Sequence, residues 1–325
     1  MGMGKREVLT CDLLLQEFHV KQVPVLDRKK LTFSEVDGKD VYNITAPFED
    51  EGEQVVAGRV ESRDSEQSEV LFFTEKEGVW VPRRDRPVLN MQDPFVSKIG
   101  DEVVVGGVQT FPDPVHQDRL LWRTVLYRGR CLRELRHFFV GPDGMKDIRL
   151  VELKNGEIGV FTRPQGAKGG RGKIGFFRVS SLEELRVDLI LDAPLLEEQF
   201  ADGEWGGVNE ARMLSNGLVG VLGHIARFDE EGNRHYYPMV FAFDPESGKY
   251  SDIELIAVRA NFEPGPAKRE DLKDVVFSGG LVRFEDGNAA LYAGISDAEA
   301  HYIIIPDPFL AYEGVNRRKK KKNGN

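Results

Sequence analysis

One acidic residue, Asp93, stands where a side chain can point into a site instead of a core. It precedes Pro94 and a predicted strand over residues 95–99, and Gly100-Asp101 then turns the chain into a second predicted strand over residues 102–109. Two strands joined by a Gly/Asp turn indicate a β-hairpin. The alternative is that Asp93 only starts a turn, because Asp-Pro is a common turn opening.

Basic residues gather in the glycine-rich stretch RPQGAKGGRGK at residues 163–173. The stretch lacks the order of a Walker A loop and of a dinucleotide fingerprint. Together with His224, which follows a predicted strand, it can form an oxyanion pocket, because Arg offers a planar fork and Lys and His offer point donors. The alternatives are a solvated hairpin loop and a structural histidine.

The sequence lacks the motifs of serine hydrolases and of zinc enzymes. There is no GxSxG elbow, no HExxH motif and no closely spaced His/Cys cluster, so we expect no catalytic zinc and no other metal. Cys11 and Cys131 are far apart, which predicts a reduced compartment without a disulfide framework.

The elements that must position these residues repeat along the chain. A strand, a tight turn, a second strand with a polar end and a third strand recur about every 50–65 residues, with units beginning near residues 41, 93, 147, 205 and 274. The dipeptides Asn155-Gly156, Asn216-Gly217 and Asp286-Gly287 predict type I′ hairpin turns. Helix is expected only around residues 182–187.

This repeat predicts an all-β fold, a five-bladed β-propeller, because radial repetition protects sheet edges. The rival is a double-sheet jelly roll, and the length also admits two domains. We expect one propeller domain over residues 1–315, with residues 1–38 adding a strand that closes the ring. Residues 316–325 form a basic tail, expected to be disordered and solvated, with a nucleic-acid or targeting arm as the alternative.

The composition of the chain limits the kinds of partner that it can bind. The chain has 325 residues, is 41% hydrophobic and carries a formal net charge of -10, so its body should repel nucleic acid and anionic membranes. The N-terminus has no apolar segment with a cleavage site, and no apolar run approaches membrane-spanning length. These features predict a cytoplasmic protein.

In a propeller, equivalent strand ends meet at the axis, so polar residues at those positions converge. The alternative is that each Asp or Asn caps its own turn. The converging residues are predicted to be Asn43, Asp93, Asp147, Arg149, Asn209, Glu210 and Asp274 from first strands, and Arg59, Glu61, Gln109, Arg163 and His224 from second strands.

Several stretches, in this order and spacing, resemble a known group. Residues 40–310 are similar to the five-bladed propellers of inverting β-mannoside phosphorylases, glycoside hydrolase family 130. They are closer to a related group of bacterial and trypanosomatid proteins, first described only as of unknown function, that includes mannosyltransferase-phosphorylases acting on β-1,2-linked mannose. The stretches are AGRVESRD at 57–64, QDPF at 92–95, GGVQTFP at 106–112, KDIR at 146–149, GRGKIG at 170–175, WGGVNE at 205–210, LGH at 222–224 and GISD at 294–297.

The resemblance implies a mechanism. Asp93 matches the single catalytic acid, which protonates the glycosidic oxygen through a sugar hydroxyl. Inorganic phosphate attacks the anomeric carbon from the opposite face and yields mannose 1-phosphate with inversion. Phosphate is then a co-substrate, no cofactor is needed, and no second carboxylate acts as base, unlike in inverting hydrolases.

The resemblance also implies binding roles. Phosphate would be held by a cationic set of Arg149, Arg171, Lys173 and His224. The mannoside would be bound by Asn43, Arg59, Glu61, Asp147, Trp205, Asn209, Glu210 and Asp297. Trp205 can stack on a sugar ring, and the equal alternative is a core aromatic.

Two other functions remain open from the sequence. A β-mannoside hydrolase of the same fold would need a second carboxylate, with Asp274 or Asp297 as candidates. A non-catalytic propeller would bind glycans or proteins without turnover. The exact sugar, its linkage and the choice between a sugar phosphate and a nucleotide sugar as donor are not determined by these residues.

Overall fold

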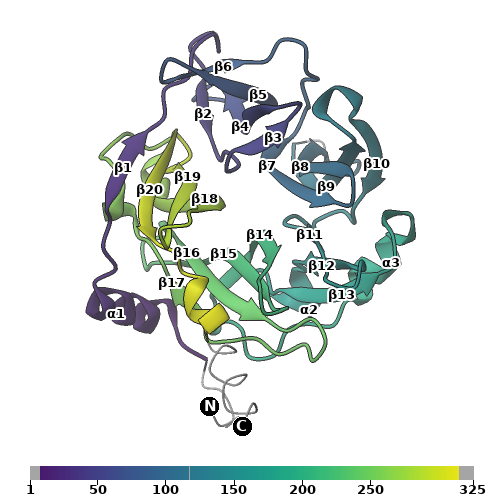
Figure 1. Cartoon of the computed structure of the whole chain (residues 1–325), viewed down its shortest axis with the longest axis vertical. Helices are drawn as coiled ribbons and strands as arrows, with labels where there is room; N and C mark the ends of the chain where they lie inside the picture. Colours follow the sequence, from purple (N-terminus) through teal and green to yellow (C-terminus); the bar gives the residue numbers. More distant parts are fainter. Residues whose placement is uncertain (1–7, 117, 315–325) are drawn as a thin grey trace.

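The computed structural model describes residues 8–116 and 118–314, and strands dominate it (Figure 1). The chain runs once around a centre, from the purple N-terminal sheet through teal and green to the yellow C-terminal strands. Strands β7, β11, β14 and β18 lie nearest that centre in Figure 1. The all-β expectation is therefore confirmed at the level of the fold class.

The strands of the described residues form four sheets. The first contains β2 (Asp40–Tyr42), β3 (Phe48–Asp50), β4 (Glu53–Glu61), β5 (Ser68–Lys76) and β6 (Val79–Pro82). The second contains β7 (Gln92–Ile99), β8 (Glu102–Pro112), β9 (Leu120–Gly129) and β10 (Arg136–Val140). The third contains β11 (Arg149–Glu152), β12 (Ile158–Thr162) and β13 (Gly175–Val179).

The fourth sheet has eight strands and consists of two antiparallel groups. One group contains β14 (Trp205–Met213), β15 (Val219–Phe228), β16 (Arg234–Phe243) and β17 (Glu254–Leu255). The other contains β18 (Asp274–Arg283), β19 (Asn288–Ile295), β20 (Glu299–Pro306) and β1 (Asp27–Lys30). A short parallel pairing joins them, with His235 opposite Asp274 and Tyr236 opposite Val275.

The core lies between neighbouring strand groups. One cluster includes Val55, Val105 and Leu132 and joins the first two sheets, and the next includes Phe95 and Val160 and joins the second and third. Apolar burial therefore binds each sheet to its neighbours around the centre.

The hairpin turns differ from the predicted type I′. Gly156, Gly217 and Gly287 adopt φ of 84°, 90° and 89°, but the Asn or Asp before each glycine keeps a negative φ. A type I′ turn needs positive φ at both central residues. The backbone hydrogen bonds of Leu153 with Glu157 and of Leu214 with Leu218 close longer loops, in which only the glycine is left-handed.

The expectation of almost no helix was wrong at the N-terminus. Helix α1 spans Cys11–Lys21, and the Thr10 hydroxyl caps it by accepting the amide of Leu13 at 3.3 Å. The helix around residues 182–187 is split into η2 (Leu182–Glu184) and α3 (Val187–Asp192). Other helices among the described residues are short and include η1 (Leu132–Glu134), α2 (Gly166–Gly169), η3 (Arg259–Asn261) and η4 (Glu270–Leu272).

The N-terminal segment also contributes to the sheets, because β1 pairs antiparallel with β20. The predicted basic tail, residues 316–325, lies outside the described residues. Within the part of the chain that the structure describes, no helix is long and apolar enough to cross a membrane.

Candidate active site

Four polar residues near the inner strands share an unusual backbone. Asn43, Asp93, Asp147 and Asp297 adopt left-handed φ values of 44°, 49°, 62° and 50°. Asn and Asp tolerate this conformation better than other side chains, because their short polar groups can bond locally. Each comes from a different strand group, as the predicted convergence requires.

Asp93 lies inside β7 and not just before the strand, which corrects the sequence prediction. The pairing register of β7 with β8 shifts between Gln92 and Phe95, so Asp93 sits in a bulge. A bulge re-aims a side chain while the strand continues on both sides. The Asp93 carboxylate is consequently turned away from the regular ladder.

Two donors hold one oxygen of Asp93. Asn43 Nδ2 donates to Asp93 Oδ1 at 2.8 Å, and Arg59 Nη1 donates to the same oxygen at 3.1 Å. Asp93 is only 8% exposed. Both side-chain hydrogen bonds from the described residues end on Oδ1, which leaves Oδ2 for a substrate or a proton.

A pocket of about 550 Å³ opens beside Asp93. That volume is within the range of roughly 300–1,000 Å³ for small-molecule sites. Of the predicted site residues, Asp93, Arg171 and Trp205 line it. The full lining is Gln92, Asp93, Val108, Thr110, Trp122, Lys146, Arg163, Gln165, Gly170, Arg171, Trp205, Phe228, Arg234 and Tyr236.

Behind Asp93 lies a buried polar network around Glu61. Arg59 Nη2 donates to Glu61 Oε2 at 2.7 Å, and Tyr42, Ser68 and Lys268 also donate to this carboxylate. Burial acts to raise the pKa of Glu61, but Arg59 and Lys268 outweigh burial and lower it. The network fixes the guanidinium that holds Asp93.

Asp297 adds a second carboxylate to this side of the site. Desolvation raises its pKa, with Arg59 opposing and the charge of Asp93 reinforcing the shift. The electrostatic coupling to both Arg59 and Asp93 puts Asp297 in the same neighbourhood as the candidate acid.

Asp147 organises the basic side of the site. Its carboxylate lies 3.4 Å from Arg163 Nη1 and 3.5 Å from Arg149 Nη2. Burial acts to raise the pKa of Asp147, but Arg163 and Arg149 overcome this and bring it to about 2. The buried Arg163 Nη1 has no hydrogen-bond partner among the described residues, so this nitrogen retains donor capacity for a ligand.

His224 supplies no positive charge near pH 7, contrary to its place in the predicted cationic set. Burial lowers its pKa to about 3. Its Nδ1 lies 2.9 Å from Asn209 Oδ1, and in this arrangement Nδ1 carries the hydrogen and Nε2 is an acceptor. The ring stacks on Tyr236 with centroids 5.4 Å apart.

The predicted ligands that do not line the pocket include Arg149, Glu210 and Lys173. Arg149 is buried under Phe95, with the guanidinium 4.0 Å from the ring centroid, and donates to the carbonyl of Asn209. Glu210 accepts the amide of Leu281 at 2.7 Å. Lys173 is exposed at the surface. Arg149 and Glu210 therefore have structural contacts, and Lys173 faces solvent.

Trp205 packs as the core aromatic that the sequence allows, and its stacking on a sugar ring stays a prediction. It is buried, its indole nitrogen donates to the Tyr236 hydroxyl at 3.2 Å, and its ring packs 4.9 Å from that of Phe228. It also lines the pocket. The Arg171 guanidinium lies over the rings of Phe228 and Trp205, at 4.9 and 5.6 Å.

Several pocket residues were not in the predicted binding sets. Arg163 was predicted as a strand end near the axis and as part of the basic 163–173 stretch, and Lys146 was noticed only as a neighbour of Asp147 in the KDIR stretch. Their position next to recognised polar residues was the available signal. Arg234, Phe228 and Tyr236 lie on long β15 and β16 strands that gave no chemical signal.

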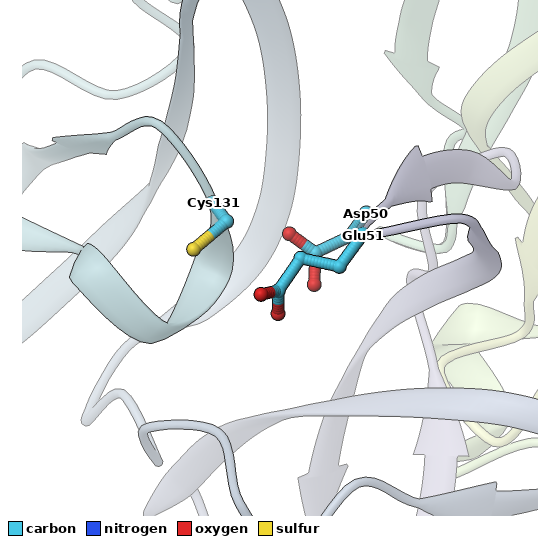
Figure 2. Close-up of side chains that lie close together, drawn as sticks. All are labelled: Asp50, Glu51 and Cys131. Atoms are coloured by element: carbon cyan, nitrogen blue, oxygen red, sulfur yellow. The ribbon is translucent and has the colours of Figure 1, made fainter.

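A separate cluster of possible metal ligands lies at the junction of the first two sheets (Figure 2). Asp50, Glu51 and Cys131 approach one another there. Arg83 donates to Asp50 at 2.9 Å and Arg86 at 3.2 Å, and Arg86 also donates to Glu51. Because arginines already neutralise these carboxylates, the cluster is explained as an ion-pair network between sheets.

Comparison with solved structures finds two similar proteins from Leishmania mexicana. The mannose phosphorylase MPT-4, in complex with a phosphate ion, is 35% identical over 92% of this chain and 94% of that chain, with a TM-score of 0.85. MPT-1, a GDP-Man-dependent mannosyltransferase, is 31% identical over 93% and 96%, with a TM-score of 0.84.

A more distant structure shares the fold alone. The β-1,2-mannobiose phosphorylase from Listeria innocua, in complex with β-1,2-mannobiose, is 13% identical over 90% of this chain and 95% of that chain, with a TM-score of 0.61. No curated protein matches the sequence. The family model described as "Protein of unknown function (DUF1861)" matches residues 17–311. This match and the identities above 30% place the chain in the DUF1861 family.

Proposed function

We propose that the protein transfers β-linked mannose between a mannoside and phosphate, by inverting phosphorolysis or the reverse reaction. One observation carries this proposal: a single pocket has Asp93 on one wall and the basic residues Lys146, Arg163, Arg171 and Arg234 in its lining. The phosphate-bound mannose phosphorylase and the mannosyltransferase from Leishmania mexicana support it.

In the proposed reaction Asp93 is the acid. Asn43 and Arg59 hold Oδ1, so the proton resides on Oδ2 and passes through a sugar hydroxyl to the glycosidic oxygen. The bond from that oxygen to the anomeric carbon breaks, and a phosphate oxygen bonds to the same carbon from the opposite face. The products are mannose 1-phosphate and the shortened mannoside.

The basic residues that line the pocket bind the nucleophile, inorganic phosphate. Phosphate is already an anion, so it needs positioning and charge neutralisation instead of a general base. Arg163 offers a rigid fork held by its own bond from Nε to the carbonyl of Gly206 at 2.9 Å. Arg171 and Arg234 approach the pocket beside Phe228.

We further propose that the fold is a single five-bladed propeller over residues 1–315. The eight-stranded sheet divides into two antiparallel groups that share only a short parallel contact, which gives five groups with the other three sheets. Strand β1 would close the ring on β20. We place the enzyme in the cytoplasm, with small mannosides and phosphate as its ligands and no nucleic-acid or membrane partner.

Product analysis tests this function. The protein would be incubated with β-1,2- and β-1,4-linked mannooligosaccharides, with and without inorganic phosphate, and the products separated. We expect mannose 1-phosphate only when phosphate is present. Absence of mannose 1-phosphate with every mannoside, together with no mannoside synthesis from mannose 1-phosphate in the reverse direction, would reject the proposal.

Hydrolysis is the second candidate, favoured by Asp297. Desolvation raises the pKa of Asp297, and its charge couples to that of Asp93, so it is a second carboxylate beside the candidate acid, as inverting hydrolysis requires. The other carboxylate considered, Asp274, already accepts from Tyr237 at 2.7 Å and contacts His235 at 2.7 Å. Release of free mannose at equal rates with and without phosphate would favour this candidate.

A further inference from the structure

Residues that adjoin the aromatic side of the pocket contact the N-terminal helix. We define the aromatic wall as Trp205, Phe228 and Tyr236: the rings of Phe228 and Tyr236 each pack against Trp205, and the Trp205 indole nitrogen donates to the Tyr236 hydroxyl. Trp205 begins β14, Phe228 ends β15, and Trp205 pairs in register with Ala226. Two residues at the edge of this wall, Glu204 and Arg227, point to helix α1.

Glu204 contacts the first residue of the helix. Its Oε1 accepts the backbone amide of Cys11 at 2.8 Å, across 193 residues of sequence. The first amides of a helix have no partner within the helix, and a carboxylate there also meets the positive end of the helix dipole. Glu204 directly precedes Trp205, so the contact restrains the start of β14.

Arg227 contacts the second residue of the helix. Its Nη2 lies 3.1 Å from Asp12 Oδ1. Arg227 directly precedes Phe228, the second member of the aromatic wall. The first turn of α1 is thus tied to two strands at the positions next to two pocket aromatics.

Packing reinforces these polar contacts. Cys11, Leu14 and Phe18 are buried in the same apolar cluster as Val208 of β14 and Ile225 of β15. The spacing of the three helical residues places them on one face of α1. The helix is therefore docked by apolar contact as well as by its N-terminal turn.

We propose that Glu204 and Arg227 are positioning residues through which α1 sets the geometry of the aromatic wall. Movement of Trp205 or Phe228 displaces the guanidinium of Arg171, which lies over both rings. The helix thus determines where a cation is presented to the anionic ligand. This inference rests on the proposed function for the identity of that ligand, inorganic phosphate.

The test compares four variants of the full-length protein. Glu204→Ala removes the acceptor for the Cys11 amide, whereas Glu204→Gln keeps an amide oxygen in its place. Asp12→Asn removes the charge opposite Arg227 at a residue that is 67% exposed, so it preserves folding. Lys21→Ala removes an exposed ion pair with Glu254 at the far end of the same helix and serves as the matched control.

Two readouts separate positioning from general stability. The first is the tryptophan emission spectrum, with Trp205→Phe variants used to isolate the Trp205 signal from those of Trp80 and Trp122. The second is the Kd for inorganic phosphate measured by calorimetry. We expect Glu204→Ala to shift Trp205 emission and raise this Kd about five-fold, with a smaller rise for Asp12→Asn and near wild-type values for Glu204→Gln.

The outcomes are distinct. Unchanged Trp205 emission and phosphate affinity in both Glu204→Ala and Asp12→Asn would overturn the inference, as would equal changes in Lys21→Ala. If the wild-type protein bound no phosphate, the proposed function would fail, and the emission spectra would still decide whether α1 positions Trp205. If Glu204→Ala did not fold, the Trp205 emission and phosphate Kd of Asp12→Asn would decide whether the inference holds.

Discussion

Arg59 and Asp93 form a buried ion pair in which Arg59 Nη1 donates to Asp93 Oδ1 at 3.1 Å. The same guanidinium donates from Nη2 to Glu61, so one arginine links the candidate acid to a buried network. Because Arg59 lies on β4 and Asp93 on β7, the pair also joins the first two sheets. The orientation of the acid is therefore coupled to the packing of neighbouring strand groups.

The first prediction concerns Asp93→Asn. This change preserves the shape and the hydrogen-bond acceptor for Arg59 but removes the acidic proton. We expect turnover of mannoside with phosphate to fall by about 10³-fold or more, with little change in the KM for phosphate. Initial rates of mannose 1-phosphate formation measure the effect, and a thermal melt confirms folding. Retention of more than a tenth of wild-type kcat would contradict the role of Asp93.

The second prediction uses two neighbouring cations. Arg171 lines the pocket and Lys173, two residues later, is exposed outside it. We expect Arg171→Gln to raise the KM for phosphate about three- to ten-fold, the effect of losing one partly solvated contact. Lys173→Gln has the same change of charge and should leave the KM unchanged. Equal effects of the two variants would show that only the net charge of the loop matters.

The third prediction concerns the stability of the network around Glu61. In Glu61→Gln, Arg59 and Lys268 remain buried but lose a carboxylate that both contact. We expect the free energy of unfolding to fall by about 3 kcal/mol, because removing one partner leaves buried charges uncompensated. Urea unfolding monitored by circular dichroism gives the value. Glu66→Gln, at the exposed edge of the same network, is the control and should change it by less than about 1 kcal/mol.

The fourth prediction concerns acid stability and His224. Its pKa is about 3 in the folded protein and 6.5 without burial. Between these values the unfolded chain binds a proton that the folded protein does not, so the free energy of unfolding falls as the pH drops from about 6.5 towards 3. His224→Gln should lose this part of the pH dependence. Identical slopes for both proteins over this window would show that His224 is not buried in its neutral form.

Asp147 titrates in a lower window than His224. Its pKa is about 2 in the folded protein against 3.8 for a free side chain, so its contribution to stability is lost only below about pH 3.8. The two windows overlap between pH 3 and 3.8, and the measurements for His224 are therefore compared above pH 4.

Much of the strand pattern is readable from the sequence. The predicted strand over residues 95–99 lies within β7 and ends at the same residue, and the predicted strand that begins at residue 102 matches the start of β8. Strands are recognised from the alternation of apolar and polar residues and from β-branched residues, and both signals can be read directly from the sequence. Helix α1 was not predicted, because only three of its residues are buried and give a weak helical pattern. The helix is stabilised by packing against strands that are distant in the sequence.

The amino-acid pattern alone is sufficient for the fold class and the hairpin positions, and the family resemblance carried by its motifs implies Asp93 as the candidate acid. Which charged residues face the pocket depends on the tertiary structure. A bulge between Val208 and Glu210 changes the face that later side chains of β14 occupy, and Glu210 consequently bonds to β18 instead of a ligand. Lys268 reaches Glu61 from 207 residues away in sequence, a contact that only the assembled strand groups create.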